Sequence, residues 1–183
     1  MTAQAAETLI LDGQEVAMSF CPGFPEDHPR IAESRYVSGR YLHTGCWRQY
    51  RGTWEIRDDR LYLVSIAGKF RLRRGQPLFA EWFSGTLRIC RGELLQYVHM
   101  GFGSVFEEEL LIDVDQGVIV ESRVQDNRGK VHDPFMLGIE SLPGRENQFD
   151  GQKAELSEDE RKHNRRLDSW ARKWRRGRLR DGG

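Results

Sequence analysis

Residues 94–124, LLQYVHMGFGSVFEEELLIDVDQGVIVESRV, decide the fold class of this chain. The stretch alternates runs of strand-forming residues with the turn segments Gly101-Phe102-Gly103 and Asp115-Gln116-Gly117. Its three candidate strands are Leu94–Met100, Ser104–Val114 and Val118–Val124. Short strands that follow one another without an intervening helix are typical of an antiparallel sheet.

The same pattern continues toward the N-terminus. A first hairpin is expected from Thr8–Leu11 and Gln14–Met18, because Asp12-Gly13 between them suits a type I′ turn. The further candidate strands are Trp47–Ile56, Arg60–Ile66, Phe70–Arg73, Leu78–Phe83 and Thr86–Cys90, the last ending before a break at Gly92. Three prolines between Phe20 and Arg35 predict a long surface loop. We therefore expect a mainly β fold, a single antiparallel β meander closed as a sandwich or a barrel, over residues 7–142.

The C-terminal part of the chain has a different character. A polar linker is expected at residues 143–156, an amphipathic helix at 157–176 and a frayed tail at 177–183. Ser157 and Glu160 have the spacing of a capping box. The apolar residues Leu167, Trp170, Ala171 and Trp174 recur every three or four positions, which predicts one apolar stripe opposite a basic face.

The formal net charge of zero hides two blocks that cancel. Residues 161–180 hold ten Lys or Arg and one acid, a charge of +9, so the rest of the chain carries −9. An acidic body with a basic tail indicates contact with an anionic partner. The candidate contact residues are Arg165, Arg166, Arg172, Lys173 and Arg176, together with Trp170 and Trp174. The alternative is that the apolar stripe packs on the protein's own sheet and the basic face points to water or to the acidic body.

The sequence offers one weak candidate for catalysis. Strand alternation places Glu108 on the apolar face of its strand, where a carboxylate must be paired, hydrogen-bonded or raised in pKa. His99 could reach it and form an acid–base pair. The favoured alternative is an ion pair between Glu108 and an arginine such as Arg88 or Arg51, because no nucleophile with an orienting partner lies nearby in the sequence.

Other classes of function have no support in the sequence. No apolar run is long enough for a membrane-spanning helix, and the N-terminus lacks the features of a secretory signal. The five histidines lack metal-ligand spacing, so neither a metal nor a cofactor is expected. Three cysteines without a C-x-x-C pair are typical of a reducing cytoplasm.

Four segments resemble a family of small bacterial proteins. They are Cys46–Ile56, Leu61–Val64, Ala80–Ile89 and Tyr97–Glu107, and the family repeats them in this order as CWRxY-x-x-TWEI, LYLV, WFSGxLRI and YVHMGxGSVxE. The resemblance implies a bacterial protein and brings no activity, ligand or catalytic residue with it. Gly52-Thr53-Trp54 is similar to the G-x-W that opens lipocalin-like barrels, although the expected role of Trp54 is that of a core residue.

The sequence therefore leaves three functions open. The preferred one is a non-enzymatic, cytoplasmic binding or interaction protein, in which the β domain is the scaffold and the basic helix contacts a protein partner or an anionic polymer. The second is a nucleic-acid-associated accessory protein that binds through the same helix. The third is an enzyme of unknown reaction that uses the face around His99 and Glu108.

Overall fold

The structure, a computed structural model, describes residues 2–130 and confirms a mainly β fold. The strands of this part are β1 (Glu7–Leu11), β2 (Gln14–Met18), β3 (Ile31–Glu33), β4 (Tyr50–Arg57), β5 (Arg60–Gly68), β6 (Phe70–Leu72), β7 (Leu78–Phe79), β8 (Gly85–Gln96), β9 (Val105–Asp115) and β10 (Val118–Asp126). Two 3₁₀ turns, Gly39–Tyr41 and Thr44–Cys46, lie between β3 and β4. The predicted linker, helix and tail at residues 143–183 lie outside the described residues.

The main sheet is mixed, so the prediction of a purely antiparallel meander is wrong. Its strand order is β2-β1-β4-β5-β10-β9-β8, with β7 paired to β5. Strands β1 and β4 run parallel, with Leu9 opposite Trp54, whereas the other pairs of the sheet are antiparallel. A parallel pair needs a long connection, and the chain between β1 and β4 includes β2 and the extended loop after it.

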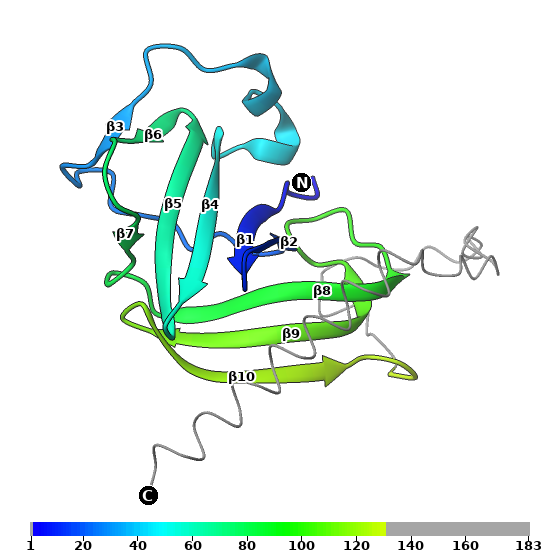
Figure 1. The fold of residues 1–183 in the computed structure, drawn as a ribbon. Helices are drawn as coiled ribbons and strands as arrows, with labels where there is room; N and C mark the ends of the chain where they lie inside the picture. Colours follow the sequence, from blue (N-terminus) through cyan, green and yellow to red (C-terminus); the bar gives the residue numbers. More distant parts are fainter. Residues whose placement is uncertain (1, 131–183) are drawn as a thin grey trace, which may run out of the picture.

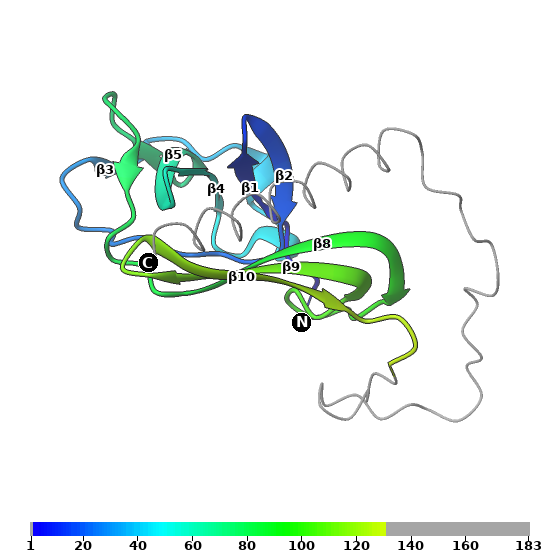
Figure 2. The same ribbon diagram turned by 60° about the horizontal axis from the view of Figure 1, so that its bottom comes forward.

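The sheet curls until its two edge strands, β2 and β8, lie next to each other. The amide of Ser19, just after β2, donates to the carbonyl of Arg88 in β8 at 2.8 Å. Figure 1 shows β4 and β5 running across the direction of β8, β9 and β10, and Figure 2 shows these last three strands as one curved layer. The core fills the space between the two halves of the sheet. Its members include Leu9, Trp54, Leu61, Leu63, Leu87, Ile89, Leu110 and Ile112.

Tight turns join the hairpins as the sequence predicts. Asp12 and Gly13 have φ values of 47° and 75°, which are the positive values that a type I′ turn requires. Gln116 and Gly117, between β9 and β10, have φ values of 45° and 79°. The predicted first hairpin is confirmed, with Leu9 opposite Val16.

Strand β8 continues through Gly92, where the sequence predicts a break between two strands. The register against β9 shifts between Arg91 and Leu94, which marks a bulge. Gly92 has a φ of 75°, and a Cβ there would lie 3.0 Å from the Cβ of Glu107. The glycine therefore bends one long strand rather than ending it.

The predicted loop from Phe20 to Arg35 contains a strand, β3, which pairs with β6 as a separate two-stranded ribbon. This ribbon lies away from β8, β9 and β10, at the upper left of Figure 1. Three aromatic rings pack together on its inner side. The ring centroid of Phe70 in β6 lies 5.3 Å from that of Phe24 and 5.7 Å from that of Tyr50. The ribbon is therefore packed against the main sheet, and its Ile31 and Phe70 belong to the same hydrophobic core.

No helix within residues 2–130 is both long and apolar enough to cross a membrane.

Candidate functional site

The structure gives different partners to the two residues of the candidate acid–base pair. The Nδ1 atom of His99 lies 2.7 Å from the hydroxyl of Tyr97, in an exposed position. Glu108 forms ion pairs with Arg91 at 2.6 Å and with Arg128 at 2.9 Å. Among residues 2–130, no hydrogen bond or ion pair joins His99 to Glu108.

The favoured reading of Glu108, an ion pair with an arginine, is confirmed, but the arginines are not the ones expected. Arg88 binds Glu109 instead, and Arg51 donates to the carbonyl of Ala6 at 2.9 Å. Arg91, the real partner on β8, has a side chain that is 1% exposed. It follows the inward residues Leu87 and Ile89 at every second position, which is the alternation of a strand.

The predicted contact residues of the C-terminal helix lie outside the described residues. They are Arg165, Arg166, Trp170, Arg172, Lys173, Trp174 and Arg176. Three features of the described residues were not found by sequence reasoning: two buried clusters of polar groups and one region rich in basic residues.

The first cluster surrounds Glu7, which is 1% exposed and points into the core from β1. Its Oε1 atom accepts from Arg48, whose Nη2 lies 2.8 Å away and whose Nε lies 2.9 Å away. Its Oε2 atom accepts from the amide of Gly52 and from the indole Nε1 of Trp54 at 3.2 Å. We call these four residues, together with Cys21, the Glu7 cluster.

This cluster explains why glycine and tryptophan stand two residues apart in β4. A Cβ on Gly52 would lie 2.7 Å from the Nε1 atom of Trp54 and closer still to the Glu7 carboxylate. The glycine therefore lets the carboxylate reach the backbone. The core position expected for Trp54 is confirmed, since it is 1% exposed. The predicted strand begins at Thr8, whereas β1 begins at Glu7, whose side chain faces inward like those of Leu9 and Leu11.

Burial raises the pKa of the acidic groups in and beside the Glu7 cluster. Burial raises the pKa of Glu7 above its ordinary 4.5, although Arg48 and the three hydrogen bonds oppose the effect. Burial and the nearby Glu7 carboxylate raise the pKa of Cys21 to about 12, and burial does the same for Tyr50. Each oxygen of Glu7 already accepts two N–H donors, so this carboxylate is poorly placed to take a proton from a substrate.

The raised pKa of Cys21 predicts that its thiol reacts slowly with alkylating reagents. A rise from 9.0 to about 12 lowers the thiolate fraction at pH 8 roughly a thousandfold, and the thiolate is the reactive form. Burial also raises the pKa of Cys90, and Cys46 is 1% exposed. We expect all three cysteines of the folded protein to resist iodoacetamide at about pH 8 and to react at once in urea, as measured by peptide mass spectrometry. Rapid labelling of Cys21 without urea would contradict the structure.

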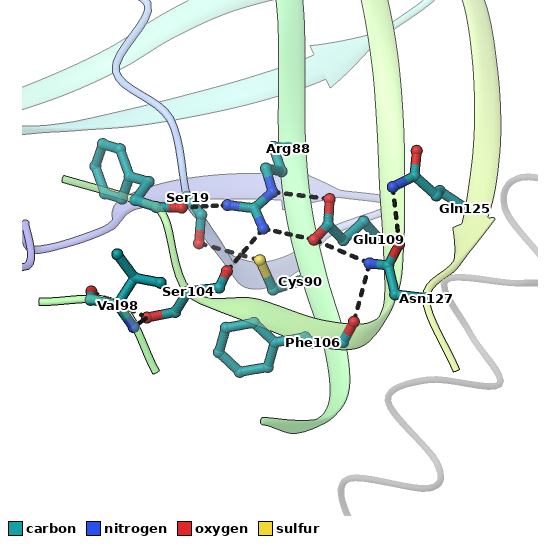
Figure 3. Close-up of polar contacts among 10 residues, drawn as sticks. Ser19, Arg88, Cys90, Val98, Ser104, Phe106, Glu109, Gln125 and Asn127 are labelled. Atoms are coloured by element: carbon teal, nitrogen blue, oxygen red, sulfur yellow. Dashed lines mark hydrogen bonds and ion pairs between the residues drawn. The ribbon is translucent and has the colours of Figure 1, made fainter. Parts of the chain in front are cut away.

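The second cluster is centred on Arg88, on the outer side of β8 (Figure 3). Its guanidinium binds Glu109 with two hydrogen bonds, from Nε at 2.9 Å and from Nη2 at 2.5 Å. It also donates to the carbonyls of Phe102 and, at 2.8 Å, Ser104 in the segment between β8 and β9. Asn127 donates to Glu109 at 3.2 Å from the other side. These bonds hold the segment against the sheet, which is a structural role.

The third feature is a concentration of basic residues in two segments, 30–40 and 69–74, which are joined by strand pairing and are called here the basic arm. It contains β3 and β6 and holds seven basic residues and one acid, a formal charge of +6. The other described residues hold nine basic and seventeen acidic residues, a charge of −8. Even if Glu26 and Asp27 just before β3 are counted, the arm keeps a charge of +4. The basic residues of the arm are Arg30, Arg35, Arg40, Lys69, Arg71, Arg73 and Arg74.

Most of these side chains have no acidic partner. Lys69 lies 3.5 Å from Glu33, and Arg30 donates to the backbone carbonyl of Arg73 at 3.2 Å. Within residues 2–130, no ion pair involves any arginine of the arm. Of the exposed arginines elsewhere in residues 2–130, Arg57, Arg123 and Arg128 each have a carboxylate partner. Arg51 binds the carbonyl of Ala6, and Arg60 lies over the ring of Phe79. The run of basic residues Lys69-Phe70-Arg71-Leu72-Arg73-Arg74 is visible in the sequence. Only the pairing of β3 with β6 shows that residues 30–40 lie beside it and enlarge the basic region.

Among the described residues, no group of three or more His, Cys, Asp or Glu side chains is arranged to hold a metal ion. The resemblance to a family of bacterial proteins stays a prediction. No family model, curated protein or solved structure matches this chain, so its function has to be inferred from its own residues.

Proposed function

We propose that the protein is a non-enzymatic binding protein that contacts the phosphates of nucleic acid through the basic arm. The observation that carries the proposal is the concentration of unpaired arginines on this arm. Arginine is suited to phosphate because its planar guanidinium can donate two parallel hydrogen bonds to it. A surface of charge +6 on a body of charge −8 also turns an approaching polyanion toward one face.

The scaffold supports this use of the arm. Phe70 and Ile31 are buried on the inner side of the ribbon, at 3% and 5% exposure, while Arg71 between Phe70 and Leu72 is exposed. The alternation therefore directs charge outward from a ribbon that is anchored by its apolar side. Binding then requires little reordering of the backbone, which favours affinity.

Two further observations support a non-enzymatic, cytoplasmic protein. In the Glu7 cluster and the Arg88 cluster, the buried carboxylates are occupied by hydrogen bonds from neighbouring side chains and backbone. Cys21, Cys46 and Cys90 are all free thiols, which is usual for proteins of a reducing compartment.

The basic C-terminal segment is the second contact in this proposal. Its candidate residues, led by Arg165 and Arg166, would add phosphate contacts to those of the arm. A protein partner bound by the same segment is the outcome to consider if nucleic acid does not bind.

The proposal predicts nucleic-acid binding that weakens steeply with salt. Each phosphate contact contributes a slope of about −0.7 for single strands and about −0.9 for duplex in a plot of log K against log salt. We expect Arg71→Gln with Arg74→Gln, in the full chain, to reduce the slope by about 1.4 with a labelled single-stranded oligonucleotide and to lower affinity about tenfold. Fluorescence anisotropy at several salt concentrations measures both quantities.

The matched control removes the same charge elsewhere. Arg57→Gln with Arg123→Gln changes two exposed arginines that already have acidic partners, Glu55 and Asp113. We expect it to leave the slope almost unchanged. Equal losses in the two double variants would show that net charge alone matters, and no binding even at low salt would refute the proposal. A third double variant, Arg165→Gln with Arg166→Gln, measures the share of the C-terminal segment.

A further inference from the structure

The basic arm contains a hollow. It has a volume of about 400 Å³ and is lined by Ser34, Arg35, Tyr36 and Arg71. Arg71 belongs to β6, and the other three residues follow β3 directly. We propose that this hollow holds one nucleotide of a single-stranded nucleic acid, with its base stacked on Tyr36 and its phosphate between Arg35 and Arg71. This inference rests on the proposed function.

Strand pairing brings the four residues together. Arg71 lies opposite Ala32 in the β3–β6 ribbon, and the amide of Ser34 donates to the carbonyl of Lys69 at 2.7 Å. The residues after β3 therefore stay within reach of β6, and two arginines line one hollow.

The charges at the hollow favour a phosphate. Arg35 and Arg71 are exposed, and within residues 2–130 neither forms an ion pair. The one acid of the arm, Glu33, is placed beside Lys69 at 3.5 Å. In the described part of the chain, no carboxylate is paired with Arg35 or Arg71, so both guanidinium groups are available to bind a phosphate.

Tyr36 favours an anion that carries a nucleobase over a simple anion. Its side chain is 80% exposed, the largest value among the large hydrophobic residues of the described chain. Within residues 2–130, no ring stacks on it and no hydrogen bond involves its side chain. An aromatic ring beside a basic groove is the usual platform for an unpaired base.

This geometry distinguishes single strands from duplex. The bases of a duplex are stacked on each other, so their faces are not available to Tyr36, whereas an unpaired base offers its face freely. A lipid headgroup would supply phosphate but no flat ring, and a single tyrosine offers little apolar area for insertion into a bilayer. We therefore infer a preference for single-stranded chains.

The test compares single-stranded and duplex oligonucleotides of equal length with the full chain. We expect Tyr36→Ala to weaken single-strand binding at least about fivefold, to leave the salt slope unchanged, and to leave duplex binding unchanged. Tyr36→Phe should keep the affinity, because the ring remains. The matched control is Tyr97→Ala, which removes another exposed tyrosine, 57% exposed, outside the arm. Thermal unfolding of each variant checks that the fold is intact.

The outcomes separate this inference from the proposed function. If single strands and duplex bind equally and Tyr36→Ala has no effect, the nucleotide site is refuted while arm-dependent, salt-sensitive binding stands. If neither single strands nor duplex bind, the nucleotide site and the proposed function are both refuted. Both are also refuted if the protein binds only vesicles that contain anionic phosphatidylglycerol. A loss with Tyr36→Phe as large as that with Tyr36→Ala would exclude stacking, because it would assign the effect to the hydroxyl.

Discussion

Replacing Glu7 with alanine is expected to lower the free energy of unfolding by about 3–5 kcal/mol, the range for removing one partner of a buried ion pair. The side chain of Arg48 is only 11% exposed, and in the variant the carbonyl of Ala5, at 2.8 Å, is the hydrogen-bond acceptor that it keeps, beside its contact with the ring of Tyr50. The amide of Gly52 and the indole of Trp54 would also lose their acceptor. A buried donor without a partner destabilises the fold more than the bond itself stabilises it.

Two variants control this result. Glu15→Ala removes an exposed acid from the neighbouring strand β2, and we expect a change within about 0.5 kcal/mol. Glu7→Gln keeps the shape and one acceptor oxygen, so its effect should lie between the other two. Urea unfolding followed by tryptophan fluorescence measures all three. A loss in the free energy of unfolding that is as small for Glu7→Ala as for Glu15→Ala would contradict the buried cluster.

The stability that Glu7 confers should also depend on pH. Burial raises the pKa of Glu7 in the folded protein above 4.5, the ordinary value that applies to the unfolded chain. Between the unfolded and the folded pKa, the folded state therefore binds the proton more tightly than the unfolded state. Stability therefore falls as pH rises through this window. We expect the wild-type protein to lose stability relative to Glu7→Gln from about pH 4 upward, as measured by urea unfolding at a series of pH values. A difference that grows with pH would mean that Arg48 outweighs burial.

The second large effect is expected at Arg88. Replacing it with alanine leaves the carboxylate of Glu109, which is 6% exposed, with Asn127 as its remaining partner at 3.2 Å. The carbonyls of Phe102 and Ser104 lose their donor at the same time. We expect a loss of about 2–4 kcal/mol in the free energy of unfolding. Arg88→Lys should lose most of this as well, because a single ammonium cannot reproduce the four bonds of the guanidinium.

Hydrogen exchange provides the specific readout for this prediction. The amides of residues 97–104 should exchange faster in Arg88→Ala, because this segment would no longer be held against β8. Arg123→Ala is the control, since its ion pair with Asp113 is half exposed and should contribute less than about 1 kcal/mol. Unchanged exchange at residues 97–104 would show that other contacts hold the segment.

Much of the local structure could be predicted from the sequence. Asp12-Gly13 and Gln116-Gly117 form tight turns because their residues tolerate positive φ, and the alternation of Leu9 with Leu11 indicates the buried face of β1. The bulge at Gly92 could not be predicted, because a glycine in a strand has the same signature whether it ends the strand or bends it. The pairing of Glu108 with an arginine was foreseen, but the choice of Arg91 and Arg128 depends on strand register.

The sequence by itself determined that this chain folds as a mainly β protein with free thiols and unevenly distributed charge, because composition, turn residues and alternation act over a few neighbouring positions. Only the tertiary structure decided that β1 lies parallel to β4, that Glu7 meets Arg48 and Trp54, and that Arg35 and Arg71 border one hollow. These arrangements join segments 36 to 47 residues apart, whose meeting depends on how the whole sheet curls and closes. The basic arm, and with it the proposed nucleotide site, belongs to this second kind of information.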